Sequence, residues 1–437
     1  MNRTMVADLR RSAGTEVTVK GLVANARILR GVVFLIVQDR SGSVQVTVER
    51  SDPPGGVEQA AVHATRGSAV EVRGAVQLNP AVRLGGLELA ARELTIVGPA
   101  EPGLPIDDTS APELQLDWRF LSLRRPQNRL LFEIQTTVER AMRDYWIERD
   151  FVEIHSPRLM HSASESGSET FSMDYFELGR AYLAQSPQFY KQMAMAAGFE
   201  RVFEIGPVFR AEPSMTPRHA TEFTSVDMEM AWIDSHEDVM AFEEEWLKAV
   251  LSKVQAEHGD AITKHFGVEV VTPSAAFPRI TMDGAHALLA RMGHTISPAT
   301  KPGDVDSEGE RIIARFVREQ HESDFFFLTE YPASLRPFYH MRAPDRPHVT
   351  RSFDLLWNSV EITTGAQREH RHDQLVAQAR EAGLRDSVQY YLDFFRYGCP
   401  PHGGFGFGLA RMLMVMLGLP SIREAVFLHR SPNRLTP

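Results

Sequence analysis

The sequence predicts an α+β protein in which a small five-stranded β-barrel precedes a larger domain, built on a mainly antiparallel sheet flanked by helices. Short alternating segments fill the first hundred residues, and a proline-rich acidic stretch follows them. The remainder mixes strands with helices but lacks the regular alternation of a parallel α/β sheet. The chain of 437 residues is also too long for one ordinary hydrophobic core. We therefore expect domains at residues 1–100 and 121–437, with a linker at residues 101–120.

The first domain is expected to contain five strands and one helix. The expected strands are residues 16–23, 32–38, 43–48, 69–76 and 87–97. The helical segment, residues 56–65, falls between the third and fourth strands, a pattern typical of an oligonucleotide-binding (OB-fold) barrel. A generic small barrel or sandwich without a ligand fits the same strands.

Composition and charge limit the class of protein. Forty-seven basic and 57 acidic residues give a net charge of −10, which argues against a non-specific coat on nucleic acid but allows a local basic groove. No apolar run approaches the roughly 18 residues of a membrane helix, and residues 1–11 lack a signal-peptide core, so we expect a cytoplasmic protein. The single cysteine, Cys399, excludes an intrachain disulfide and a cysteine-based zinc site.

Two segments open the second domain. Apolar residues from Leu130 to Trp146 recur at helical spacing and predict a long amphipathic helix that starts near Pro126. Residues 151–157 then alternate like a strand that ends at Pro157. Such a strand often lies at the edge of a sheet, where another subunit can cover it.

Residues 201–212 and 223–230 alternate like two adjacent strands around a ten-residue loop. The alternation places Arg210 and Glu212 on one face of the first strand. On the second strand it groups an aromatic ring with polar side chains: Phe223, Ser225, Asp227 and Glu229. The fork of an arginine suits a phosphate, and an aromatic ring can stack on a purine. The loop adds Arg218 and His219 as further cations, although a surface hairpin with ordinary ion pairs fits the segment as well.

Residues 351–364 form an expected hairpin with a two-residue turn, in which Leu356 faces Glu361. Asp354 then becomes a diagonal neighbour of Glu361 on the same surface. Two close carboxylates need neutralisation, and oxygen ligands suit Mg²⁺ bound with ATP phosphates. The alternative is an acidic pair on a solvated face.

Two further segments carry arginines beside this hairpin. Arg368 leaves the expected sheet next to the two acids and is a candidate carboxylate-binding fork, whereas the alternating arginines argue against a metal site at His370 and His372. Residues 400–411 form a glycine-rich strand that leads into a helix at Arg411, and its bare face could accept a flat ligand. The segment lacks the lysine of a phosphate-binding loop.

Together these segments resemble the three signature motifs of class II aminoacyl-tRNA synthetases. Pro157 closes the first motif, Arg210 lies in the second and Arg411 ends the third. The N-terminal barrel, residues 185–191 and residues 365–368 resemble aspartyl-tRNA synthetases of the archaeal and eukaryotic type. The resemblance implies a class II catalytic domain that joins L-aspartate to tRNA through an aspartyl-adenylate, with ATP and Mg²⁺.

The resemblance also implies residue roles. Arg210 and Arg411 would be catalytic. The residues that would contact ATP are Arg210, Glu212, Arg218, His219, Phe223, Glu361 and Arg411. Those that would bind aspartate are Ser164, Glu165, Gln188, Lys191, Asp227, Thr364 and Arg368. Mg²⁺ would be carried by Asp354, Glu361 and Thr364. The anticodon would be read by Arg27, Phe34, Gln45, Pro80 and Glu88.

Differences from the family pattern bear on tRNA choice. Enzymes of this type that accept only tRNA(Asp) often have tryptophan where this chain has Ala24, and Pro80 resembles the proline of relaxed members. We therefore expect charging of tRNA(Asp) and also tRNA(Asn), with a tRNA-dependent amidotransferase as a possible partner. The first motif implies a homodimer.

Three alternatives remain open: a synthetase restricted to tRNA(Asp), an asparaginyl-tRNA synthetase, and a catalytically silent RNA-binding paralogue. Lys191 and Arg368 favour an anionic amino-acid side chain over a neutral amide.

Overall fold

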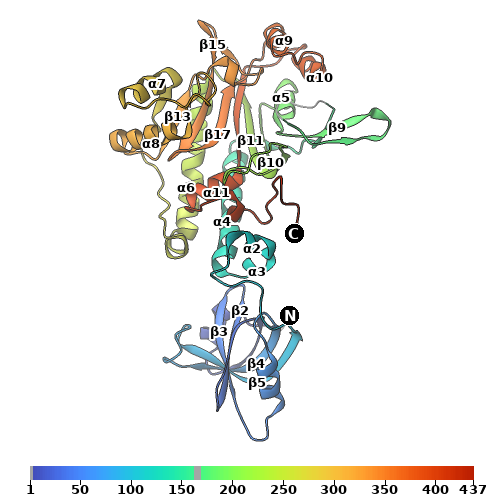
Figure 1. Ribbon diagram of the computed structural model, residues 1–437, viewed down its shortest axis with the longest axis vertical. Coiled ribbons are helices and arrows are strands. Elements are labelled where there is room, and N and C mark those ends of the chain that lie inside the picture. The colour runs from blue at the N-terminus through green and yellow to red at the C-terminus, as the bar shows by residue number, and fades with distance from the viewer. Residues whose placement is uncertain (1–2, 162–168) are drawn as a thin grey trace. The chain divides into compact units, whose positions relative to one another are not determined.

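The chain divides into two compact units, Met1–Trp118 and Arg119–Pro437, in a computed structural model that describes residues 3–161 and 169–437 (Figure 1). The first unit is a closed barrel with the strand order β1-β2-β3-β5-β4. The second unit is built around an eight-stranded sheet. The predicted α+β class, with a five-stranded barrel before a larger domain built on a sheet and helices, is confirmed.

The barrel follows from the alternation of its strands. The elements of the first unit are the short 3₁₀ helix η1 (Val6–Ser12), β1 (Glu16–Ile28), β2 (Val32–Asp39), β3 (Gly42–Glu49), α1 (Gly56–His63), β4 (Ala69–Leu78), β5 (Leu87–Gly98) and, after the barrel, α2 (Pro112–Asp117). Val33, Leu35 and Val37 of β2 are fully buried, and the residues between them are only half-buried. A period of two therefore gives each strand one face in the core and one outer face that can carry binding residues. Helix α2 lies within the segment assigned to the linker.

The sheet of the second unit is mixed rather than wholly antiparallel. Its order is β12-β13-β16-β17-β18-β11-β10-β6, and the β12/β13 and β10/β6 pairs are parallel. The strands are β6 (Val152–Glu153), β10 (Arg201–Phe209), β11 (Glu222–Ala231), β12 (Arg279–Thr281), β13 (Phe325–Thr329), β16 (Ser352–Trp357), β17 (Val360–Gln367) and β18 (His402–Gly408). The strand before Pro157 is at the edge, as expected, although β6 is only two residues long.

Two long helices cover one face of this sheet (Figure 1). They are α4 (Pro126–Ile147), which begins at the predicted proline, and α6 (His236–Phe266), which begins with a capping box formed by Ser235 and Asp238. Trp146 of α4 stacks on Trp246 of α6, with ring centres 5.2 Å apart. This packing leaves the opposite face of the sheet for the site and for two smaller groups of helices.

Smaller elements flank that opposite face in two groups. Helices α7 (Met282–Arg291) and α8 (Ser307–His321) pack against Phe326, Leu328 and Leu356. On the other side lie α5 (Gln188–Ala196), α9 (His372–Glu381) and α10 (Gln389–Asp393). The remaining elements are α3 (Arg119–Ser122), β7 (Leu159–Met160), β8 (Ser172–Asp174), η2 (Phe176–Leu178), β9 (Arg180–Leu183), η3 (Ala333–Leu335), β14 (Arg342–Ala343), β15 (Arg346–Thr350), α11 (Leu409–Met416) and α12 (Ile422–Ala425). Among the helices that the structure describes, none is both long and apolar enough to cross a membrane.

Candidate active site

A cavity of about 320 Å³ opens on the face of the sheet between these two groups of helices. Residues from β11, β17, β18, α5, α11 and the β10–β11 connection line it. The predicted site residues in its wall are Gln188, Arg210, Glu212, Arg218, His219, Phe223, Asp227, Glu361, Thr364, Arg368 and Arg411. Segments more than two hundred residues apart in the chain thus meet in one place.

The β10–β11 hairpin positions the phosphate-binding candidates. Strand β10 ends at Phe209, but the main-chain N–H of Arg210 still donates to Thr221 O at 2.9 Å, so the ladder continues by one residue. The Arg210 guanidinium carbon lies 5.4 Å from the centre of the Phe223 ring. The prediction that the strand extends to Glu212 was wrong, because the chain leaves the ladder first. Glu212 reaches the cavity from the loop instead.

The same loop brings His219 into the cavity wall. Its Nδ1 atom lies 2.5 Å from the hydroxyl oxygen of Thr216. Burial, followed by the positive charge of Arg411, lowers the pKa of His219. His219 is therefore a neutral hydrogen-bonding group near neutral pH rather than an additional cation.

The glycines of β18 make room for carboxylates as well as for a ligand. Asp227 pairs with Gly406 and Glu229 with Gly404 across the β11–β18 ladder. A Cβ atom on Gly406 would lie 2.4 Å from Asp227 Oδ1, and one on Gly404 would lie 2.5 Å from Glu229 Oε2. Gly406 also lines the cavity, as the predicted bare strand face requires.

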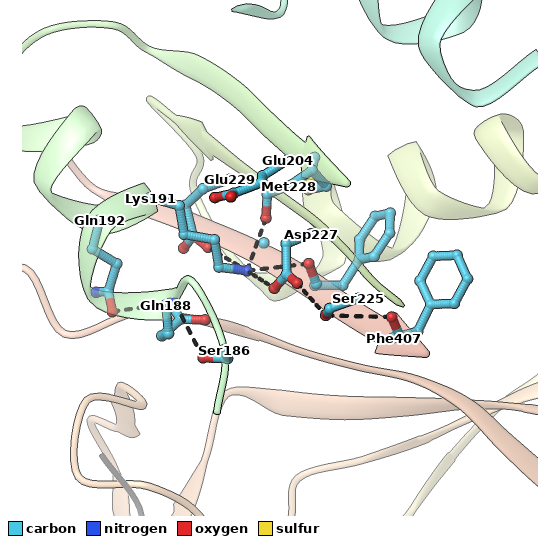
Figure 2. Close-up of polar contacts among 12 residues, drawn as sticks. Ser186, Gln188, Lys191, Gln192, Glu204, Ser225, Asp227, Met228, Glu229 and Phe407 are labelled. Carbon is cyan, nitrogen blue, oxygen red and sulfur yellow. Dashed lines mark hydrogen bonds and ion pairs between the residues drawn. The ribbon is translucent and has the colours of Figure 1, made fainter. Parts of the chain in front are cut away.

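Lys191 is held inside the protein by these two acids (Figure 2). Its Nζ atom lies 3.1 Å from Asp227 Oδ1 and 3.2 Å from Glu229 Oε2, and its side chain is 2% exposed. Ser225 Oγ donates to the second oxygen of Asp227 at 2.5 Å. Lys191 is therefore not a surface residue, and it contacts Asp227 from behind the cavity wall instead of lining the cavity.

Arg368 reaches the cavity from the end of β17 and is 3% exposed. Its Nε donates to Glu229 Oε1 at 3.0 Å, and its Nη2 donates to Gly404 O at 3.0 Å. Burial raises the pKa of Glu229, but Arg368 and Lys191 outweigh burial, and the net shift is downward. Two cations thus meet the two carboxylates Asp227 and Glu229. From the sequence alone, Lys191 and Arg368 are two cations without identified partners, which favour an anionic amino-acid side chain. This inference must be corrected, because the two carboxylates balance both positive charges, and the net charge of the site does not select an anionic substrate.

The β16–β17 hairpin has the predicted register, with Leu356 opposite Glu361. A bulge next to Leu355 inserts one extra residue into β17, so Glu361 and Thr364 project on the same side of the strand. Thr364 Oγ1 donates to Glu361 Oε1 at 3.1 Å. Arg411 Nη1 donates to Glu361 O at 3.0 Å and to its carboxylate at 3.2 Å. Because of the bulge, the candidate metal residues Glu361 and Thr364 lie together, and Glu361 also contacts Arg411 of α11.

Asp354 lies behind Arg336 and does not line the cavity. Arg336 Nη2 is 2.7 Å from Asp354 Oδ2, whereas Oδ1 is buried with no hydrogen-bond partner among residues 3–161 and 169–437. Burial raises the pKa of Asp354, although Arg336 opposes this shift. An unpartnered carboxylate oxygen beside Glu361 fits a metal ion.

The described part of the chain contains no group of three His, Cys, Asp or Glu side chains that could hold a metal ion without other ligands. Mg²⁺ typically binds one or two carboxylates together with substrate phosphates. The Asp354 and Glu361 pair therefore fits Mg²⁺ that is also bound by a nucleotide.

Sequence reasoning missed several polar residues in or near the cavity wall, among them Arg336, His340 and Glu310. Arg336 and His340 line the cavity from the segment between η3 and β14, where no periodic pattern marks them. Glu310 of α8 has a pKa raised to about 7 by burial and then by Glu361. Two predicted residues, Ser164 and Glu165, lie outside the described residues.

The outer face of the barrel carries the predicted anticodon residues. Arg27 pairs with Phe34 between β1 and β2, and Gln45 pairs with Glu88 between β3 and β5. Gln45 Nε2 donates to Glu88 Oε2 at 3.0 Å, and Asn79 Nδ2 donates to Glu88 Oε1 at 2.8 Å. Burial raises the pKa of Glu88, but hydrogen bonds from Thr47, Asn79 and Gln45 outweigh burial, and the net shift is downward.

Ala24 and Pro80 lie in irregular parts of the barrel. Ala24 is the extra residue of a bulge in β1, between Val23 and Asn25, and is half-buried. Pro80 is exposed in the connection between β4 and β5.

Comparison with known proteins agrees with this geometry. Residues 111–431 match the family described as tRNA synthetases class II (D, K and N), and residues 17–97 match the OB-fold nucleic acid binding domain. The aspartate–tRNA(Asp) ligase of Thermococcus kodakarensis is 40% identical over 97% of both chains. The aspartate–tRNA(Asp/Asn) ligase of Aeropyrum pernix is 41% identical over 99% of this chain and 98% of its own.

Solved structures show the same similarity. The asparaginyl-tRNA synthetase of Pyrococcus horikoshii, complexed with asparaginyl-adenylate, superposes with a TM-score of 0.88 at 30% identity over 99% of each chain. The aspartyl-tRNA synthetase of Entamoeba histolytica gives a TM-score of 0.87 at 29% identity, over all of this chain and 92% of its own. The chain therefore belongs to the class II tRNA synthetases of the D, K and N group.

Proposed function

We propose that this chain attaches L-aspartate to tRNA in an ATP-dependent reaction that passes through an aspartyl-adenylate. The observation that carries the proposal is the convergence of Arg210, Phe223, Arg411 and Arg368 on one cavity. An aromatic ring with arginines beside it suits ATP, and a further buried arginine suits a carboxylate. Relatives named as aspartate–tRNA ligases, about 40% identical over nearly the whole chain, support the choice of amino acid.

In the first step an oxygen of the aspartate α-carboxylate attacks the α-phosphorus of ATP, and the bond to pyrophosphate breaks. Arg210 binds the α-phosphate while the adenine stacks on Phe223. Arg411, held by Glu361, binds the γ-phosphate and the other face of the adenine. Mg²⁺ carried by Asp354, Glu361 and Thr364 would neutralise phosphate charge. No protein nucleophile is needed, so positioning and electrostatic stabilisation supply the catalysis.

Arg368 pairs with the aspartate side chain, and Gln188 and Asp227 hold its α-amino end. Ser225 and Lys191 support Asp227, because both donate hydrogen bonds to its carboxylate. In the second step the terminal ribose hydroxyl of tRNA attacks the carbonyl carbon of the mixed anhydride. The ester forms and AMP leaves.

The second candidate function is that of an asparaginyl-tRNA synthetase. Two observations favour it: the similarity to the Pyrococcus horikoshii enzyme, and the balance of Lys191 and Arg368 by two carboxylates. The test is ATP–pyrophosphate exchange by the purified protein with aspartate or asparagine. Exchange with aspartate alone is expected. Exchange with asparagine alone would establish the alternative, and exchange with neither would indicate an RNA-binding paralogue.

We propose further that the enzyme charges both tRNA(Asp) and tRNA(Asn). The two tRNAs differ at the third anticodon base, and the small Ala24 at a bulge leaves more room than a tryptophan would. Relatives from Aeropyrum pernix and Methanopyrus kandleri are named as Asp/Asn ligases, while those from Thermococcus and Pyrococcus are named for tRNA(Asp) alone.

Charging of purified tRNA(Asp) and tRNA(Asn) with labelled aspartate tests this breadth. Charging of both tRNAs by the wild type, and of tRNA(Asp) alone by Ala24→Trp, is the expected result. Charging of one tRNA by the wild type contradicts it. A broad enzyme would also require an amidotransferase that converts aspartyl-tRNA(Asn), and both would act in the cytoplasm.

The enzyme is also proposed to be a homodimer. Strand β6 is the last strand of the sheet, so no strand among the described residues pairs with its outer side, and Val152 within it is 45% exposed. Light scattering at micromolar concentration is expected to give twice the chain mass, and a monomer mass would refute the dimer.

A further inference from the structure

Three of the five donor groups of Arg368 have partners within the protein. A guanidinium group carries five N–H donors and no acceptor. One donor on Nε binds Glu229, one on Nη2 binds Gly404 O, and one on Nη1 is directed at His340 Nε2, 2.9 Å away. Among the described residues this leaves two donors without a protein partner, one on each terminal nitrogen. Arg368 lines the cavity, so both can serve a ligand there.

His340 can form this hydrogen bond with Arg368 only as the acceptor. Arginine nitrogens only donate, so His340 Nε2 must be unprotonated and the ring proton must lie on Nδ1. Burial lowers the pKa of His340 well below its usual value, and the charges of Arg368, Arg336 and Lys191 lower it further. His340 is 3% exposed, and its Nδ1 has no hydrogen-bond partner in the described structure. The contact with Arg368 therefore fixes the tautomer.

The main chain also holds His340 next to Arg368. The two residues form an isolated antiparallel bridge. Gln378 of α9 donates to His340 O at 3.1 Å and to Phe338 O at 2.5 Å. The imidazole is thus placed by backbone contacts that do not depend on a ligand.

A pair of free donors on two adjacent nitrogens discriminates between a carboxylate and an amide. A carboxylate offers an acceptor oxygen to each donor, which gives two parallel hydrogen bonds. An amide offers one acceptor oxygen and turns an NH₂ group towards the second donor, which then remains unpaired in a buried place. Because Asp227 and Glu229 balance the charges of Lys191 and Arg368, this donor pattern can discriminate where net charge does not.

We propose that His340 is a positioning residue that determines specificity for the amino-acid side chain. It accepts a hydrogen bond from one donor of Arg368 Nη1, and this contact orients the two free donors of Arg368 as a fork that binds a carboxylate. The proposal deepens the proposed function and rests on it. Without an acceptor at this place, Nη1 would carry two free donors and the fork would lose its fixed orientation. Discrimination against asparagine should then fall while ATP binding is retained.

The experiment compares His340→Leu, which removes the acceptor, with His340→Gln, whose amide oxygen can approach the position of Nε2. The exposed His348 of β15 provides a matched control, His348→Leu. ATP–pyrophosphate exchange gives kcat and the KM values for aspartate and ATP, and the ratio of kcat/KM for aspartate to that for asparagine. Thermal melting of each variant reports folding.

We expect His340→Leu to raise the KM for aspartate and to lower the aspartate preference, each by about tenfold, as for a lost hydrogen bond to a charged group. The KM for ATP should stay at the wild-type value, and His340→Gln should recover most of the preference. His348→Leu should match the wild type throughout.

Equal increases in both KM values, or an unchanged preference in His340→Leu, would refute the positioning role. A wild-type protein that shows no exchange with aspartate would refute the proposed function itself. The two failures are therefore distinguishable.

Discussion

Glu243 of α6 allows a quantitative prediction about stability and pH. Its side chain is fully buried beneath the sheet, and Thr363 Oγ1 donates to its Oε1 at 2.5 Å. Burial, and to a smaller extent the charge of Asp354, raises the pKa of Glu243 to about 8 from an ordinary value of 4.5. The folded protein therefore holds this carboxyl group protonated at neutral pH.

The sign of the pH effect follows from the raised pKa. Between pH 4.5 and 8 the unfolded chain has lost the Glu243 proton while the folded protein retains it, so stability falls as pH rises through this range. The range covers 3.5 pH units, and each unit corresponds to about 1.4 kcal/mol, which gives a total of about 5 kcal/mol. Glu243→Gln replaces the neutral acid with a neutral amide of the same shape and removes the titration. Relative to the wild type, the variant should gain about 5 kcal/mol of unfolding free energy between pH 4.5 and 8.

Urea unfolding at fixed protein concentration and several pH values measures this gain. The stacked Trp146 and Trp246 lie in the same core and provide the fluorescence signal. Other titrating groups affect both proteins equally and cancel in the difference. Glu244→Gln is the matched control, because Glu244 forms an i,i+4 ion pair with Lys248, which is expected to contribute less than about 1 kcal/mol. A stability difference between Glu243→Gln and wild type that stays constant from pH 5 to 8 would show that Glu243 is ionised in the folded protein.

Three further predictions concern the cavity. Gly406→Ala places a Cβ atom 2.4 Å from Asp227 Oδ1 and should lower kcat/KM for aspartate by about a hundredfold in exchange assays, because the displaced carboxylate no longer holds the substrate. Phe223→Leu removes the stacking surface and should raise the KM for ATP about tenfold, with the KM for aspartate unchanged. Arg336→Met removes the ion pair that orients Asp354 through its Oδ2 atom. We therefore expect that half-maximal exchange requires a higher Mg²⁺ concentration. Electron paramagnetic resonance should also show weaker binding of Mn²⁺ in the presence of ATP.

Each of these predictions has its own counter-result. Gly31→Ala, at a site with no neighbouring atom within 4 Å, is the control for the glycine variant, and equal losses in both would exclude the steric explanation. If Phe223→Leu leaves the KM for ATP unchanged, the adenine does not stack on Phe223. Metal binding that is unchanged in Arg336→Met would show that Asp354 keeps its orientation without the arginine.

Local periodicity alone predicted most of the architecture. The alternation of Val33, Leu35 and Val37 requires a strand with one buried face, and the spacing from Leu131 to Trp146 requires a helix with one buried stripe. These patterns lie within single segments, so they predict a strand or a helix without knowledge of the segments that pack against it. The residue types in the motifs likewise predicted eleven of the residues in the cavity wall, because phosphate, purine and carboxylate each require particular side chains.

Contacts between distant segments decided the rest. The bulge in β17 depends on its pairing with β16, and it sets Glu361 and Thr364 on one side although simple alternation would separate them. The position of Glu212 depended in the same way on where β10 leaves its ladder with β11.

Lys191 and Arg368 appeared in the sequence as two cations, and only the folded sheet shows that Glu229 lies between them. His340 comes from a segment without any period, and it meets Arg368 through a main-chain bridge. The sequence by itself therefore determined which chemical groups the site contains. The tertiary structure decided which of their charges and donors remain available to a ligand, because hydrogen bonds and ion pairs depend on distances that only the assembled sheet sets.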